Sequence, residues 1–249
     1  MANSGRFGGR TAVVTGGGRG IGRAIALALG AEGASVGVVA RSREQCEAVA
    51  EAIGDRGLAL PGDVSDAERC GRAIAELTAR FGRPSVLVNA AGISPVRGSA
   101  ERQDIETFAQ ILNVNLVGAF TMTRAAAESL HEGGGAVVNI ASVLGTAGSP
   151  LLSAYGASKA ALIQLTRTLA REWADHGVRV NAVCPGYVET DLTAKMLANQ
   201  QILSSILEQT PMRRLAEMHE VVAPVLFLLS DDASYITGAA LPVDGGLAA

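Results

Sequence analysis

One glycine-rich segment near the N-terminus constrains the fold of this chain more than any other feature. Residues 15–22 read Thr-Gly-Gly-Gly-Arg-Gly-Ile-Gly, directly after the apolar run 11–14, and a helical apolar pattern and a second apolar run at 35–39 follow. A strand, a glycine turn, a helix and a strand within about thirty residues are the setting of a dinucleotide-binding turn. A plain tight turn is the alternative, but it needs fewer glycines. We therefore predict nucleotide binding by Gly16, Gly18, Arg19, Gly20, Ile21 and Gly22.

The same alternation of apolar runs and helical patterns continues to the end of the chain. Further strands are expected at 58–60, 86–88, 136–140, 178–183 and 236–243, and further helices at 44–54, 67–81, 103–130, 155–173 and 220–230. Pro224 would be tolerated in the last of these helices only near its first turn. No internal repeat or linker is evident. The pattern predicts an α/β protein: a single doubly wound Rossmann-fold domain over residues 1–249, with about seven parallel strands and helices on both faces of the sheet.

Composition excludes several classes of function. Hydrophobic residues make up 48% of the chain and charged residues 18%, which argues against disorder. A net charge of −3 without a basic tract gives nucleic-acid binding no electrostatic support. No apolar run is long enough to span a bilayer, and residues 1–10 lack the apolar core of a signal peptide, so we expect a cytoplasmic protein without a membrane partner. The three cysteines and three histidines are scattered, and we expect no metal site.

The end of the second strand bears on the choice of cofactor. An acidic residue there would bind the ribose 2′-hydroxyl of NAD, whereas a basic residue would accept the 2′-phosphate of NADP. This chain has Arg41 and Ser42 at that point, with Arg19 available from the glycine turn. NADP(H) is therefore favoured and NAD(H) remains possible, because these arginines can also be solvated loop charges.

Two later strand ends offer further cofactor contacts. Asp63 and Val64 follow the third strand, where Asp63 can bind an adenine amino group or simply cap a turn. The fourth strand ends in Asn89, Ala90, Ala91 and Gly92, small residues that let a cofactor approach the backbone. Asn89 can also be a structural turn residue, and we expect both roles.

A third set of residues indicates proton-transfer chemistry. Tyr155 and Lys159 are four apart on an expected helix and share one face, so the ammonium should lower the pKa of the phenol. Alone, such a pair is more often a solvated helix face. Ser142, however, follows the fifth strand, where open parallel sheets bind ligands. Asn113 and Asn115 interrupt the helix at 103–130, which indicates a kink or a polar role.

The segment 187–212 departs from the alternating pattern. It is polar and helical in propensity, without a strand, which is typical of an active-site lid and also of a surface excursion.

Taken together, these motifs resemble the short-chain dehydrogenase/reductase family from end to end. The resemblance rests on residues 15–22, Asn-Ala-Ala-Gly at 89–92, Ser142 before Tyr155-x-x-x-Lys159, and Pro185-Gly186. It implies that Tyr155 is the general acid/base, that Lys159 lowers the pKa of Tyr155 and holds the nicotinamide ribose, and that Ser142 orients the substrate oxygen. It also implies that Asn115 kinks its helix within a proton relay. Nicotinamide contacts are implied for Pro185, Gly186, Val188 and Thr190.

The resemblance also implies an activity and partners. It predicts an oxidoreductase that interconverts a ketone and a secondary alcohol with NADP(H), acting on a small molecule as a homotetramer or homodimer. The chain is similar to 3-oxoacyl-carrier-protein reductases, for which Lys195, Arg213 and Arg214 could meet an acidic carrier, and to sugar-alcohol or steroid dehydrogenases using NAD. A non-catalytic dinucleotide sensor is disfavoured because Tyr155 and Lys159 are both present. Substrate identity should depend on 93–99, 143–152 and 187–212.

Overall fold

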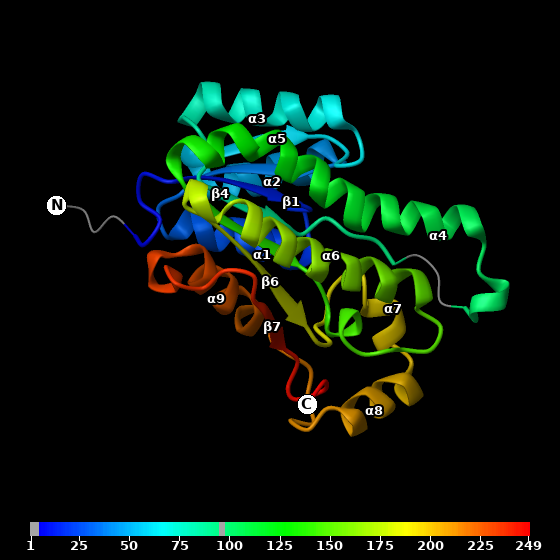
Figure 1. The fold of residues 1–249 in the computed structure, drawn as a ribbon. Helices are drawn as coiled ribbons and strands as arrows, with labels where there is room; N and C mark the ends of the chain where they lie inside the picture. The colour runs from blue at the N-terminus through cyan, green and yellow to red at the C-terminus, as the bar shows by residue number, and fades with distance from the viewer. Residues whose placement is uncertain (1–4, 95–97) are drawn as a thin grey trace.

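A computed structural model describes residues 5–94 and 98–249, and within them the strands form one seven-stranded parallel sheet (Figure 1). The order is β3-β2-β1-β4-β5-β6-β7, with every neighbouring pair parallel. The strands are β1 (Thr11–Thr15), β2 (Ser35–Ala40), β3 (Gly57–Pro61), β4 (Val86–Asn89), β5 (Gly135–Ile140), β6 (Val178–Pro185) and β7 (Ala240–Val243). The helices are α1 (Gly20–Ala31), α2 (Arg43–Ile53), α3 (Ala67–Phe81), α4 (Ile105–Leu112), α5 (Gly118–Gly133), α6 (Ser153–Glu172), α7 (Ala194–Leu197), α8 (Gln200–Gln209) and α9 (Met218–Leu229). The predicted fold class is confirmed.

Helices cover both faces of the sheet (Figure 1). Helices α1, α2 and α9 pack on one face, and α3, α5 and α6 pack on the other. The strands alternate between the two cores: Val14 lies in the first and Val13 in the second, and both are fully buried. Burial on both faces explains why the strands appear in the sequence as continuous apolar runs rather than as alternating patterns.

The long helix expected at 103–130 is divided into two α-helices. Between α4 and α5 the backbone forms a π-helical turn over Asn113–Val117. Such turns are rare and occur mostly at functional sites. The interruption that the asparagines indicated is therefore present, and it separates α4, which extends away from the sheet, from α5, which packs on it (Figure 1).

The boundaries of the last strand and the last helix also differ from those expected. The last strand is limited to β7, because Gly238 at φ +75° turns the chain away from the extended ladder and leaves 236–239 as a loop. Helix α9 begins two residues earlier than expected, since the Glu220 carboxylate accepts a hydrogen bond from the Glu217 N–H (2.8 Å) and completes a capping box. Pro224 therefore lies in the second turn of α9 rather than the first.

The segment after β6 forms a separate cap beyond the strand ends. It contains α7 and α8, which project past the tips of β6 and β7 (Figure 1). The chain returns at Ala216, which forms an isolated parallel bridge with Val188. In residues 5–94 and 98–249, none of the helices combines the length and apolar character needed to cross a membrane.

Candidate active site

A cavity of about 390 Å³ lies at the carboxyl ends of the strands, within the size range of ligand sites. Its wall is built from the ends of β1, β2, β4, β5 and β6 and from the segment that follows β6. The order of the sheet reverses between β1 and β4, and open α/β sheets bind ligands at this point. Most of the residues predicted from the sequence line this one cavity.

The glycine turn forms the tightest part of the wall. Gly16 has φ +63°, and a Cβ atom there would lie 2.7 Å from the Ala91 backbone nitrogen. A Cβ atom on Gly22 would lie 2.3 Å from the Gly16 carbonyl oxygen. Both positions exclude any side chain, so the turn brings backbone N–H groups and the N-terminus of α1 up to the cavity. This cradle fits the diphosphate of a dinucleotide.

The region expected to bind adenosine contains Arg41, Ser42 and Asp63, which all line the cavity. Ser42 is the N-cap of α2, and its hydroxyl accepts a hydrogen bond from the Gln45 N–H (3.2 Å), leaving the hydroxyl proton able to donate. Asp63 accepts hydrogen bonds from the Ser65 N–H (2.9 Å) and hydroxyl (2.6 Å). Burial opposes ionisation of Asp63, but these bonds and the Arg41 charge lower its pKa overall. Asp63 thus shapes a turn and still presents a carboxylate beside Arg41.

Asn115 is fully buried in the π-helical turn, and its side chain has three partners. The side-chain oxygen accepts from the Ile93 N–H (2.8 Å), and the side-chain nitrogen donates to the Ile93 carbonyl (3.0 Å) and to the Ser158 hydroxyl (3.0 Å). Ser158 donates in turn to the Tyr155 carbonyl (2.7 Å). Val114, rather than Asn115, lines the cavity. Asn115 therefore links the loop after β4 to α6.

Tyr155, Lys159 and Ser142 meet at the end of β5. Tyr155 is half-buried, Lys159 is 4% exposed and Ser142 is 7% exposed. The Lys159 ammonium lies 5.7 Å from the centre of the Tyr155 ring and donates a hydrogen bond to the Ile140 carbonyl (2.7 Å). All three residues line the cavity, so the helical spacing in the sequence does correspond to one site.

The pKa of Tyr155 is displaced in the opposite direction to the expected one. Burial raises it to about 12, and a hydrogen bond with the Ser142 hydroxyl offsets only part of this effect. Burial also lowers the pKa of Lys159 to about 8. Withdrawal from water disfavours both charged forms, and the protein alone does not overcome this penalty.

Asn89 lies outside the cavity lining, whereas Ala90, Ala91 and Gly92 belong to it. The Asn89 side chain is 3% exposed and donates to the Thr123 hydroxyl (2.9 Å) and to the Asn139 side-chain oxygen (2.9 Å). Asn139 donates to the Thr166 hydroxyl (2.8 Å). This buried chain of hydrogen bonds connects α5, β4, β5 and α6, which is the structural role considered for Asn89.

The wall formed by the end of β6 and the segment after it includes Pro185, Gly186, Val188 and Thr190, as expected. It also includes Asp191, Leu192 and Thr193, which the sequence interpretation missed. Thr193 hydrogen-bonds to the backbone of Val188 and to Thr190. The Thr-x-x-Thr spacing, which places two hydroxyls on one turn, could have identified it. Of the expected substrate loops, residues 95–97 of 93–99 lie outside the described residues.

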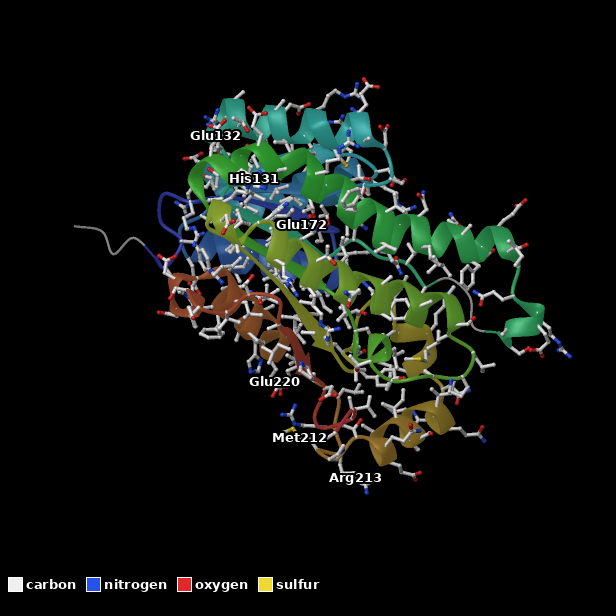
Figure 2. All side chains as sticks on the ribbon, viewed as in Figure 1. His131, Glu132, Glu172, Met212, Arg213 and Glu220 are labelled. Carbon is white, nitrogen blue, oxygen red and sulfur yellow. The ribbon has the colours of Figure 1, made fainter. Side chains whose placement is uncertain are left out.

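Of the three cationic residues considered for an acidic carrier, Arg213 and Arg214 bond within the chain and Lys195 is exposed. Arg214 makes two hydrogen bonds to the Glu220 carboxylate (2.6 Å each), and Arg213 donates to the Glu208 carbonyl (3.0 Å). Figure 2 shows Arg213 and Met212 near the C-terminal turn, with Glu220 above them. Among the described residues, no group of three or more potential ligands could hold a metal ion. The rings of His131 and His176 stack with their centroids 4.0 Å apart, but they are only two ligands.

Comparison with known proteins identifies relatives along nearly the whole chain. Residues 16–248 match a family model described as enoyl-(acyl carrier protein) reductase. Galactitol 2-dehydrogenase (L-tagatose-forming) of Cereibacter sphaeroides is 43% identical over 245 residues, covering 97% of this chain and 96% of that protein. A 3-oxoacyl-[acyl-carrier-protein] reductase of Staphylococcus aureus is 38% identical over 243 residues, covering 96% of this chain and 98% of that protein.

Solved structures are similarly close. A short-chain type dehydrogenase/reductase from Mycobacterium ulcerans superposes with a TM-score of 0.93 at 33% identity, covering 97% of this chain and 90% of that one. A gluconate 5-dehydrogenase from Burkholderia cenocepacia, in complex with NADP and tartrate, superposes with a TM-score of 0.92 at 32% identity. The match covers 97% of this chain and 97% of that one.

Proposed function

The chain belongs to the short-chain dehydrogenase/reductase family of NAD(P)-dependent oxidoreductases, which interconvert ketones and secondary alcohols, and on this premise we propose that Tyr155 transfers the proton. The convergence of Tyr155, Lys159 and Ser142 on one cavity supports this role most directly. A nicotinamide cofactor held in this cavity would supply or accept the hydride. Tyr155 donates a proton to the carbonyl oxygen in reduction and removes it from the alcohol in oxidation.

Neighbouring residues hold the reacting groups for this transfer. Ser142 hydrogen-bonds the substrate oxygen and orients it beside Tyr155. Lys159 would hold the nicotinamide ribose and favour ionisation of Tyr155. With its raised pKa, Tyr155 stays protonated at neutral pH and can donate its proton in reduction, whereas oxidation requires stabilisation of its phenolate.

Asn115 contributes by position in this proposal. Its side-chain contacts with Ile93 and Ser158 hold the π-helical turn against α6. Because the Asn115 side chain is occupied by these contacts, a role of this turn in a proton relay would fall to its backbone.

We further propose NADP(H) as the preferred cofactor. Arg41 and the hydroxyl of Ser42, at the N-terminus of α2, provide a positive charge and a donor for a 2′-phosphate. Fluorescence titration with NADPH and NADH tests this, and equal or tighter binding of NADH would contradict the role of Arg41. The proposed cofactor-binding set is Gly16, Gly18, Arg19, Gly20, Ile21, Gly22, Arg41, Ser42, Asp63, Val64, Asn89, Ala90, Ala91, Gly92, Tyr155, Lys159, Pro185, Gly186, Val188 and Thr190, with Asn89 acting through its buried contacts.

For the substrate, we propose a small free polyol or its ketone, with a 3-oxoacyl thioester as the alternative. The pairing of Arg214 with Glu220 partly neutralises one of the three cations considered for an acidic carrier, which weakens the support for the thioester. The galactitol dehydrogenase relative supports a sugar alcohol. A panel of alcohols and ketones that includes galactitol, L-tagatose and an acetoacetyl thioester, followed at the NADPH absorbance, discriminates these classes. Turnover of the thioester alone would make the 3-oxoacyl thioester, rather than the polyol, the favoured substrate class.

The decisive experiment on catalysis replaces Tyr155 by Phe. Loss of the phenol proton should reduce kcat by about 10²–10⁴-fold while cofactor binding persists. Tyr235→Phe is the matched control because Tyr235 is fully exposed (103%). If Tyr155→Phe retained wild-type turnover of a substrate found in the panel, the catalytic assignment would be wrong.

We propose the remaining properties on the same basis: one domain over 1–249 with 187–212 as its lid, a cytoplasmic location, and a homotetramer or homodimer. Val117 and Phe120 support assembly, because these apolar side chains are 44% and 43% exposed where α5 begins. Light scattering after size exclusion gives the oligomeric state, and a single cooperative unfolding transition would support one domain. Cell fractionation tests the location.

A further inference from the structure

Thr193 stands out because a single hydroxyl organises the turn at the start of the lid. Its Oγ1 lies 2.6 Å from the Val188 carbonyl oxygen, 2.9 Å from the Thr190 backbone nitrogen and 3.1 Å from the Thr190 Oγ1. A fourth neighbour, the Thr190 carbonyl oxygen, is at 3.3 Å. Thr193 itself lines the cavity beside Thr190.

The proton count of these groups fixes the direction of each hydrogen bond. A hydroxyl has one proton to donate and two lone pairs to accept with. The Val188 carbonyl is much the nearer of the two acceptors, at 2.6 Å against 3.3 Å for the Thr190 carbonyl, so the Thr193 proton goes to Val188. The Thr190 N–H then donates to Thr193, and the hydroxyl–hydroxyl contact requires Thr190 as the donor.

This arrangement determines what Thr190 can offer to a ligand. Because its own proton is engaged by Thr193, its Oγ1 presents only lone pairs to the cavity. The Thr190 methyl group lies toward the glycine turn, since a Cβ atom on Gly20 would be 3.8 Å from the Thr190 Cγ2. Thr190 therefore accepts, and does not donate, a hydrogen bond.

We propose that Thr193 is a positioning residue that makes Thr190 an acceptor, and thereby selects a cofactor carrying an N–H group, the carboxamide of nicotinamide, at this point. The inference rests on the proposed function, in which Thr190 contacts the nicotinamide end of the cofactor. It adds Thr193 as the residue that orients this contact, and it states the direction of the hydrogen bond: the ligand donates and Thr190 accepts.

Calorimetric titration with NADP⁺ and its 3-acetylpyridine analogue tests the polarity. The analogue keeps a carbonyl oxygen but replaces the amide N–H₂ by a methyl group. The wild-type protein should bind the analogue about tenfold more weakly, since one hydrogen bond is lost and an acceptor is left facing a methyl group. The corresponding NAD⁺ pair is titrated in parallel, so that the cofactor preference does not decide the outcome.

Variants then test the part played by Thr193. Thr193→Val should weaken binding of NADP⁺ and bring the ratio of the NADP⁺ affinity to the analogue affinity close to one. The reason is that the freed Thr190 hydroxyl can donate to the carbonyl that both ligands share. Thr193→Ser keeps the hydroxyl and should restore the wild-type ratio. Thr168→Val is the control, since the Thr168 hydroxyl bonds to the Gln164 carbonyl on the exposed side of α6.

Several outcomes would overturn the proposal. Equal binding of the two ligands by the wild-type protein would do so without any variant. So would a Thr193→Val protein that weakens both ligands by the same factor, because a purely structural residue would have that effect. Failure of the wild-type protein to bind any of these dinucleotides would overturn the proposed function as well, and is thus distinguishable from a loss of discrimination alone.

Discussion

The cavity has two facing walls that are built on different physical principles. The glycine turn at 15–22 is shaped by backbone sterics, since a Cβ atom on Gly16 or Gly22 would overlap main-chain atoms. The opposite wall, 185–193, is shaped by hydroxyl hydrogen bonds centred on Thr193. The first wall excludes a side chain at Gly16 and Gly22, whereas the contacts of the second depend on the direction in which one hydroxyl proton is donated.

The difference predicts how each wall responds to substitution. Steric overlap with the backbone disturbs the fold itself, because main-chain atoms cannot move aside as a flexible side chain can. A lost hydroxyl changes the contacts offered to a ligand and leaves the sheet intact. Substitutions in the first wall should therefore affect stability and binding together, and those in the second should affect binding selectively.

The largest effect is expected for Gly22→Ala. The new methyl group would overlap the Gly16 carbonyl oxygen, which lies 2.3 Å from the Cβ position, and should lower the free energy of unfolding by about 3 kcal/mol. Dinucleotide binding should be lost with it. Urea unfolding and fluorescence titration measure the two effects.

Gly71→Ala is the matched control for this substitution. Gly71 lies within α3, and apart from the local backbone of that helix and the adjacent residues, an added Cβ atom would meet no atom of the described residues within 4 Å. Removing a helix-interior glycine should stabilise the protein by about 0.5–1 kcal/mol. Equal effects of the two substitutions would show that sterics do not govern the glycine wall.

Lys159 on α6, which also lines the cavity, should serve activity at a cost in stability. The pKa of buried Lys159 falls from 10.5 to about 8, which corresponds to a penalty of roughly 3 kcal/mol at neutral pH. Lys159→Met removes this penalty but also the bond to the Ile140 carbonyl, so we expect a net gain of about 1–2 kcal/mol together with loss of activity.

The pH dependence provides a second measure of Lys159. Between about pH 8 and 10 the unfolded chain holds a proton on this lysine that the folded protein has released, so this group makes stability rise with pH. The rise should be missing in Lys159→Met and present in Lys195→Met, whose lysine is exposed. A destabilised Lys159→Met protein would contradict the assigned burial penalty.

The smallest global effect is expected where the lid rejoins the body of the protein. Arg214→Gln breaks the exposed pair with Glu220 and should change overall stability little. Hydrogen exchange in 187–212 should nevertheless become severalfold faster, since the return of the lid is then less firmly held. Arg72→Gln, which breaks the exposed pair with Glu68 on α3, should leave exchange in the lid unchanged.

The sequence predicts the glycine wall better than the lid wall for a physical reason. Glycine spacing and buried apolar runs act through local backbone geometry, so the fold and residues such as Gly16 and Gly22 can be identified from the sequence. The position of Lys159 beside Tyr155 also follows from helical spacing. The hydroxyl of Thr193 gains its meaning only from the turn that brings Val188 and Thr190 to it, and this turn has no strong sequence signature.

The extent of burial around Tyr155 and Lys159 also could not be predicted from the sequence. The spacing of Tyr155 and Lys159 led to the expectation of a lowered Tyr155 pKa, but the direction depends on how completely the surrounding elements exclude water. The late start of the last strand has a similar cause, because the left-handed conformation of Gly238 is a property of the packed structure.

The buried cysteines have a practical consequence. Cys46, Cys70 and Cys184 are all buried as free thiols, and burial raises the pKa of each. Thiolate is the form that maleimides attack, so the folded protein should react slowly with these reagents. A cysteine introduced at exposed Ala198, between α7 and α8, would then be the preferred site for a fluorophore. The natural chain thus provides a background in which lid movement can be followed optically without first removing its own thiols.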